Sequence, residues 1–110
     1  MAISKPPADT LFVSPTPLGF SVRVTRRQWQ RIVEIKHPAM AEREDAVREA
    51  VVNPVEVRQS QRAPDVYLCY KQERPGRWIC AVVRRVNGDG FLVTAYVTDA
   101  IKEGVRIWPK

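Results

Sequence analysis

The chain contains a single histidine, His37, within the segment EIKHPAM (residues 34–40). An imidazole takes up and releases protons near neutral pH, so this side chain is the first candidate for acid–base chemistry. A structural role is equally open, because the dipole of a preceding helix favours an imidazolium at its C-terminus. The residue type alone does not decide between the two.

A first set of residues whose types can bind phosphate lies in VEVRQS (residues 55–60). Its alternating pattern predicts a strand in which Arg58 and Ser60 point away from the face that carries Val57. A guanidinium binds phosphate in a bidentate manner, and a hydroxyl donates to phosphate oxygens. A solvated strand arginine would look the same in the sequence.

A second set lies in GFLVTAYVTD (residues 90–99). Strict alternation predicts one face with Phe91, Val93, Ala95 and Val97, and an opposite face with Leu92, Thr94, Tyr96 and Thr98. The hydroxyls of Thr94 and Tyr96 are candidate phosphate ligands. Threonine and tyrosine are also common in ordinary strands.

Together these residue types suit cleavage of a phosphodiester without a metal or other cofactor. The 2′-hydroxyl of RNA can serve as nucleophile, so a protein supplies only a base, an acid and charge stabilisation. We expect His37 to be the base. Candidate contacts to the RNA backbone are the basic residues Arg31, Arg84, Arg85 and Lys102, which can equally be solubilising charges.

The charge balance supports an anionic partner. Lys and Arg number 18 against 12 Asp and Glu, which gives a net charge of +6 and a pI near 9.8. Nucleic acid is the commonest partner of such a surface, and RNA is the one expected here. One histidine and two separated cysteines lack the spacing of a zinc site, so no metal is expected.

The location expected from the sequence is the cytoplasm. No apolar run approaches the roughly 18 residues of a membrane helix, and the N-terminus lacks the apolar region of a secretory signal. Cys69 and Cys80 lie in apolar, strand-like runs, which favours buried thiols in a reducing compartment, with a cross-strand contact between them as an alternative.

Two helices are predicted near the N-terminus. Residues 1–19, rich in proline, are expected to be an extended arm in which LFV forms a short edge strand, and residues 20–110 to form one domain. After a strand at 20–25, a helix capped by Thr25 should end near His37, because the next residue is a proline. A second helix is expected over about 39–52, and its apolar stripe is Met40, Val47, Ala50 and Val51.

The remaining segments predict a sheet. Strands are expected in VEVRQS, DVYLCYK, WICAVVRRV and GFLVTAYVTD, followed by a helical turn in AIKEG and a strand in RIW. The turn signal NGDG favours a tight hairpin. The fold class is therefore α+β, with an N-terminal strand and two helices packed on a four- to five-stranded antiparallel sheet.

Five sequence patterns follow one another over residues 20–110: W..I....HP, V..P..V..S, VYLCY, WICAVV and GFLVTAY.TD.IKEG...W. Their order and spacing resemble the phage-type branch of the barnase–EndoU–colicin–RelE (BECR) nuclease-like fold. The resemblance implies metal-independent RNA cleavage, with His37 as acid or base. It implies polar site positions at Arg58, Ser60, Thr94 and Tyr96 and a basic one at Lys102. A second histidine is absent, which leaves Tyr96 or Lys102 as the other proton carrier.

Three functions follow as hypotheses. The first is a small endoribonuclease, phage-derived or toxin-like. The second is a catalytically inactive RNA-binding module on the same fold. The third is a protein-interaction module that binds a cognate antitoxin or immunity-type partner through the acidic start of the second helix, around Glu44 and Asp45.

Overall fold

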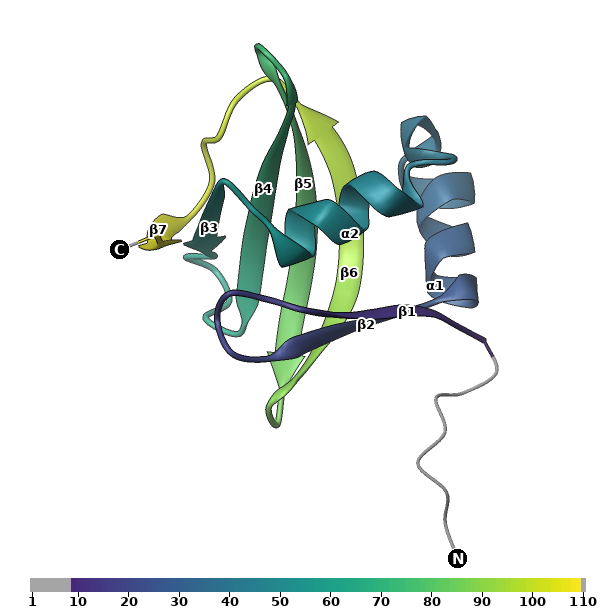
Figure 1. Cartoon of the computed structure of the whole chain (residues 1–110), viewed down its shortest axis with the longest axis horizontal. Coiled ribbons are helices and arrows are strands. Elements are labelled where there is room, and N and C mark those ends of the chain that lie inside the picture. The colour runs from purple at the N-terminus through teal and green to yellow at the C-terminus, as the bar shows by residue number, and fades with distance from the viewer. Residues whose placement is uncertain (1–8, 110) are drawn as a thin grey trace, which may run out of the picture.

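The computed structural model describes residues 9–109 and shows an α+β fold (Figure 1). The elements in chain order are β1 (Thr10–Pro15), β2 (Ser21–Thr25), α1 (Arg26–Arg31), a π-helical turn (Ile32–Lys36), a 3₁₀ turn (Pro38–Met40), α2 (Glu44–Val52), β3 (Glu56–Gln59), β4 (Val66–Arg74), β5 (Arg77–Val86), β6 (Asp89–Thr98) and β7 (Val105–Trp108). The α+β class is therefore confirmed.

The sheet is larger than predicted. It has seven strands in the order β1-β2-β6-β5-β4-β3-β7. The predicted antiparallel array β3–β6 is present, and the NGDG signal forms a two-residue turn at Asn87 and Gly88, both with positive φ. The estimate of four to five strands was too low, because β1 and β2 extend the sheet beyond β6 and β7 extends it beyond β3. The β2–β6 pairing is parallel, so the sheet is mixed.

The predicted N-terminal arm is partly wrong. LFV does lie in an edge strand, but that strand runs over Thr10–Pro15 and pairs with β2. Its Phe12 is buried in the main core, so the domain begins before residue 20. Residues 1–8, the rest of the expected arm, lie outside the described residues.

One face of the sheet carries the helices, and we call it the helical face. In Figure 1, α2 crosses in front of β4, β5 and β6, and α1 lies beside β6. The fully buried residues of α2 are Val47, Ala50 and Val51, as the sequence predicted. They share one core with strand residues such as Val57 and Ala81. Burying each large aliphatic side chain stabilises the fold by about 1.5–3 kcal/mol.

The opposite face, which we call the open face, carries a second apolar cluster of Leu68, Tyr70, Cys80 and Val82. The segment 99–104 crosses this face from β6 to β7, and its Ile101 packs on the cluster. A helical turn was predicted there and is absent. The crossing spans four strand spacings, about 19 Å, which six residues cover only when extended. A helix of that length would rise about 9 Å.

The strict alternation predicted for β6 is broken by a β-bulge at Val93. Val82 pairs with Thr94, but Val83 pairs with Leu92, so one residue of β6 is extra. Leu92 consequently lies in the main core and not beside Thr94. The extra residue also places the side chain of Phe91 on the open face, opposite to that of Leu92.

Cys69 and Cys80 are both free and buried, as predicted. They belong to different apolar clusters, because adjacent strand positions point to opposite faces. The cross-strand contact offered as an alternative is therefore not formed: Cys69 pairs with Ala81, and Cys80 pairs with Tyr70.

Candidate functional site

A pocket of about 450 Å³ opens on the open face beside the crossing segment. Its polar lining residues are His37, Ser60, Thr94, Tyr96 and Glu103, above an apolar floor of Val66, Leu68 and Val82. A second pocket of about 300 Å³ shares Ser60, Leu68 and Glu103 and adds Gln61, Arg62, Lys102 and Gly104. We call the two together the groove. Four of the five predicted catalytic residues line it, from three separate segments of the chain.

His37 reaches the groove because the first helix ends there. The Thr25 hydroxyl caps the helix by accepting from the Gln28 N–H at 3.0 Å. The last turn widens to a π turn, in which the His37 N–H donates to the Ile32 carbonyl at 2.7 Å. The imidazole then lies against Tyr96, with ring centroids 5.8 Å apart and planes tilted by 42°. The sequence left open whether His37 faces the TAY strand, and the structure brings the two together.

Side chains of the first helical segment hold it to the edge of β6. The Gln28 amide donates to the carbonyls of Leu92 and Val93 at 2.9 and 3.1 Å, and the Lys36 ammonium donates to Val93 at 3.2 Å. These carbonyls are available because β2 pairs with β6 only at Gly90 and Phe91. These contacts with the unpaired edge of β6 therefore position the helix that presents His37.

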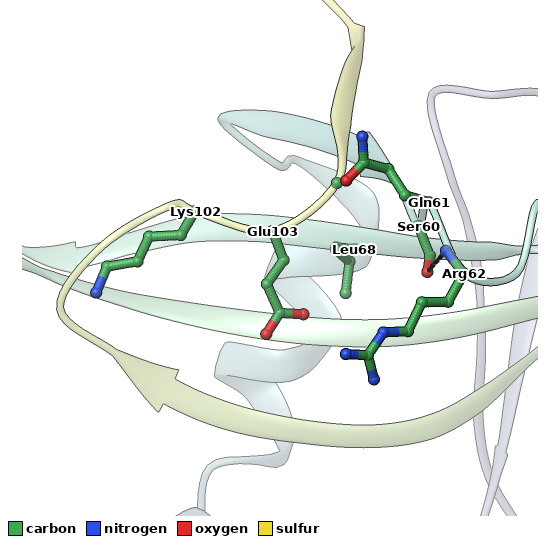
Figure 2. Close-up of a pocket in the computed structure, with 7 residues that line it drawn as sticks. Ser60, Gln61, Arg62, Leu68, Lys102 and Glu103 are labelled. Atoms are coloured by element: carbon green, nitrogen blue, oxygen red, sulfur yellow. Dashed lines mark hydrogen bonds between the residues drawn. The ribbon is translucent and has the colours of Figure 1, made fainter.

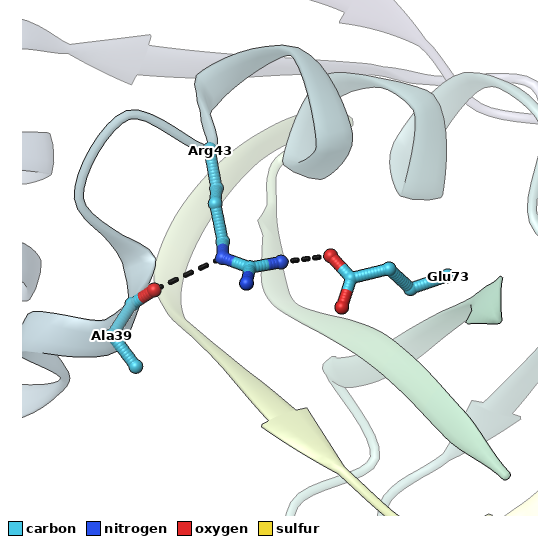
Figure 3. A network of polar contacts seen from close by, with 3 residues as sticks. All are labelled: Ala39, Arg43 and Glu73. Carbon is cyan, nitrogen blue, oxygen red and sulfur yellow. Dashed lines mark hydrogen bonds and ion pairs between the residues drawn. The ribbon is translucent and has the colours of Figure 1, made fainter.

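The segment that follows His37 is held by Arg43. Its Nε donates to the Ala39 carbonyl at 3.0 Å, and its Nη1 pairs with the Glu73 carboxylate at the end of β4 (Figure 3). His37 is therefore fixed from both sides, by α1 before it and by this contact after it.

Tyr96 belongs to a row of cross-strand neighbours, Tyr70, Cys80 and Tyr96, on β4, β5 and β6. Burial raises the pKa of Tyr70 and of Cys80 to about 12. Burial, with further contributions from Cys80 and Tyr70, raises the pKa of Tyr96 well above its usual range. The Tyr96 hydroxyl therefore stays protonated, which suits a hydrogen-bond donor and argues against a second proton carrier.

The hydroxyls of Ser60 and Thr94 differ in whether they already have a hydrogen-bond partner. Ser60 Oγ accepts from the N–H groups of Arg62 and Ala63 at 3.2 and 3.4 Å, so it shapes the turn after β3. Thr94 Oγ1 is buried and has no hydrogen-bond partner among residues 9–109. A buried hydroxyl without a partner is costly, and one that lines a groove is suited to a ligand or a water molecule.

Arg58 lies on the predicted face but does not line the groove. Its Nη1 donates to the Ile101 carbonyl at 3.3 Å, and its Nε lies 3.5 Å from a Glu56 carboxylate oxygen, an ion pair without hydrogen-bond geometry. The guanidinium thus holds the crossing segment in place. Its expected role as a direct phosphate ligand does not fit this placement.

The predicted basic residues are dispersed. Arg84 and Arg85 point to opposite faces: Arg84 Nε pairs with Asp65 at 3.1 Å, and the Arg85 guanidinium lies 4.8 Å from the centre of the Phe20 ring. Arg31 is exposed on α1 and lines neither pocket of the groove. Only Lys102 lies at the groove, and Figure 2 shows its side chain extending away from Arg62.

Two groove residues were not anticipated as functional. Glu103 lines both pockets, and Arg62 lines the second; Figure 2 shows their side chains extending over the same part of the sheet. Arg62 makes no side-chain ion pair within the described part of the chain. Both residues come from loops, where no periodicity indicates orientation, so the sequence offered only their residue types as a signal.

Within residues 9–109 there is no cluster of three or more side chains able to hold a metal ion, and no helix has the length and apolar character needed to cross a membrane. Comparison with family models, curated proteins and solved structures finds no match for this chain. Function must therefore be argued from the groove itself.

Proposed function

We propose that the groove is the active site of a metal-independent endoribonuclease. The observation that carries the proposal is the meeting of His37 and Glu103 in one pocket that also contains a buried, unpartnered hydroxyl, Thr94 Oγ1. Two proton carriers and a phosphate-binding hydroxyl are what cleavage by a 2′-hydroxyl requires. The proposal keeps the resemblance to the BECR nuclease-like fold that the sequence suggested, and a cytoplasmic setting in which the two thiols remain free.

The division of roles follows from the chemistry of the two groups. An ionised carboxylate only accepts hydrogen bonds, whereas an imidazolium donates from both nitrogens. In place of the base role expected for His37, we assign Glu103 to take the proton of the 2′-hydroxyl, whose oxygen attacks phosphorus. The bond from phosphorus to the 5′-oxygen breaks, and His37 gives its proton to that oxygen. The products are a 2′,3′-cyclic phosphate end and a 5′-hydroxyl end.

The other groove residues stabilise the charged phosphate. Arg62, which lines the groove and makes no side-chain ion pair in the described structure, supplies a cation, and Thr94 and Tyr96 supply hydroxyl donors. Apolar side chains on the floor, Leu68 and Val82, are suited to the face of a base or ribose. Arg58 acts indirectly, by holding the crossing segment that presents Glu103.

The test is cleavage of end-labelled RNA in EDTA by the wild type, His37→Ala and Glu103→Gln. Each variant should lose about 10²–10⁴-fold in rate, the usual contribution of a general acid or base. Glu34→Gln, an exposed carboxylate on the first helical segment, is the matched control and reveals any co-purifying nuclease. Wild-type rates in both groove variants would refute the proposal.

A second substrate separates the two roles. In a uridine phosphodiester with a nitrophenolate leaving group, the leaving oxygen departs without taking up a proton. His37→Ala should therefore regain most of its activity on this substrate, whereas Glu103→Gln should not. Rescue of Glu103→Gln alone would reverse the assignment.

A catalytically inactive RNA-binding module is the second candidate. Two predicted catalytic residues already have structural contacts, since Arg58 holds Ile101 and Tyr96 packs, partly buried, against the cluster that contains Tyr70 and Cys80. This function predicts affinity that falls with salt and no turnover in the wild type.

A further inference from the structure

The open face continues from the groove onto the N-terminal strands. Backbone pairing places one line of side chains across five strands, in the order Val13, Arg23, Phe91, Arg84 and Val66. Val66 also lines the groove. The line therefore joins the candidate active site to a surface that the proposed mechanism does not use.

Phe91 is the exposed aromatic centre of this line. Its side chain is 41% exposed, whereas Phe12 and Phe20 are 9% and 6% exposed in the core. A single exposed apolar residue needs no special explanation. Phe91, however, is paired with an arginine on each neighbouring strand, Arg23 on β2 and Arg84 on β5, across the usual spacing of about 4.8 Å between strand backbones.

The flanking arginines are available to an anion. Arg23 is exposed and makes no ion pair or side-chain hydrogen bond within residues 9–109. Arg84 pairs with Asp65, but the two side chains are 54% and 45% exposed, and such a surface pair is worth little. A phosphate can replace the carboxylate at small cost. A shallow pocket of about 50 Å³ borders Arg23 and Phe91 on the side away from the groove.

We propose that Phe91 is a stacking platform for an unpaired base, with Arg23 and Arg84 contacting the phosphates on either side. The substrate of the groove is then single-stranded RNA, so this inference rests on the proposed function. An aromatic ring stacks on any base, but only on one whose face is free of its own neighbours. Phe91 and Thr94 are three residues apart on β6, about 10 Å, so one strand reaches both.

The test is binding, measured by fluorescence anisotropy with a short 2′-O-methyl oligonucleotide, which lacks the nucleophile and cannot be cleaved. Phe91→Ala should weaken binding of the single strand by about 5- to 150-fold, which corresponds to the ~1–3 kcal/mol of one stacked base. Phe91→Leu should lose a similar factor, because it keeps apolar area without a ring. Phe91→Trp should retain affinity, and its added fluorescence should be quenched on binding.

Two further variants sharpen the result. Val55→Ala is the matched control, because Val55 is 51% exposed and precedes β3, away from this line. Arg23→Gln should reduce the slope of log affinity against log salt by about 0.7, the value of one phosphate contact on a single strand. Duplex RNA should bind more weakly than the single strand and be insensitive to Phe91→Ala.

Several results would overturn the inference: a wild type that binds no single strand at low salt, full affinity in Phe91→Ala, full affinity in Phe91→Leu, or equal losses for duplex and single strand. A wild-type dimer that Phe91→Ala dissociates, with unchanged oligonucleotide affinity, would instead assign this surface to a second copy of the chain. Binding that depends on Phe91 without any RNA cleavage would support the platform and refute the proposed catalysis, so the two failures are distinguishable.

Discussion

Gly104 provides a direct test of whether the crossing segment builds the groove. This residue follows Glu103, lines the groove and has φ +77. A Cβ added there would lie 2.5 Å from the Gln59 carbonyl oxygen and 3.3 Å from Arg58 Cβ. Because the oxygen belongs to the backbone of β3, it cannot rotate away, and Gly104→Ala must displace either the segment or β7.

A matched control lies in the β4–β5 hairpin. Gly76 also has φ +77, but a Cβ added there would meet no atom within 4 Å. Gly76→Ala should therefore cost only the left-handed strain of an L-residue, about 1–2 kcal/mol. Gly104→Ala should cost the same strain plus about 1–3 kcal/mol for overpacking. The difference between the two variants isolates the contact with β3.

The measurement is urea unfolding of both variants, together with RNA cleavage by the folded protein. Gly104→Ala should be less stable than Gly76→Ala by about 1–3 kcal/mol. It should also lose activity under conditions in which it remains folded, because Glu103 moves with the segment. Equal stabilities, or a folded Gly104→Ala with wild-type cleavage, would refute the idea that close packing on β3 positions Glu103.

Three further predictions concern the elements that support the site. Thr25→Ala removes the cap of α1 and should lower the free energy of unfolding by about 1 kcal/mol in urea titrations, with Thr25→Ser restoring most of it. Gln28→Ala leaves the Leu92 carbonyl without its side-chain donor and the Val93 carbonyl with Lys36 alone, so it should lower stability by about 1–3 kcal/mol and cleavage with it. An unchanged unfolding midpoint would contradict this coupling of α1 to β6. Burial raises the pKa of Cys69 and Cys80 from 9.0 to about 12 and that of Tyr70 from 10.0 to about 12. The unfolded chain releases these protons at lower pH than the folded chain, so these groups should not affect the free energy of unfolding below about pH 9 and should lower it as the pH rises toward 12. Urea unfolding midpoints at neutral pH and at about pH 10.5 test this. The fall between the two should be smaller in Cys69→Ala.

The α+β class and the central elements were predictable because they rest on local patterns. Alternation identified β3 to β6, the NGDG turn fixed one hairpin, and Pro38 ended the first helical segment at His37. The apolar stripe of α2 was also correct, since a helix period is read directly from the sequence. Four of the five predicted catalytic residues line one groove. Strand alternation explains why Thr94 and Tyr96 share a face, whereas His37 reaches the groove from the end of the first helical segment.

Other features depended on contacts between distant segments. The bulge at Val93 follows from how β5 and β6 pair, and it reversed the predicted faces of Phe91 and Leu92. The engagement of Arg58 depends on where the Ile101 carbonyl lies, which is set by the distance from β6 to β7.

Residue types and local periodicity thus determined by themselves the fold class, the central strands, the positive charge and the polar strand face with Ser60, Thr94 and Tyr96, whereas the tertiary structure brought His37 to it. Only the tertiary structure brought Glu103 and Arg62 to that face, engaged Arg58 elsewhere and exposed Phe91 between two arginines. The physical reason is that periodicity orients a side chain within its own strand or helix. Loops have no periodicity, and a bulge or an edge pairing is fixed by strands far apart in the chain.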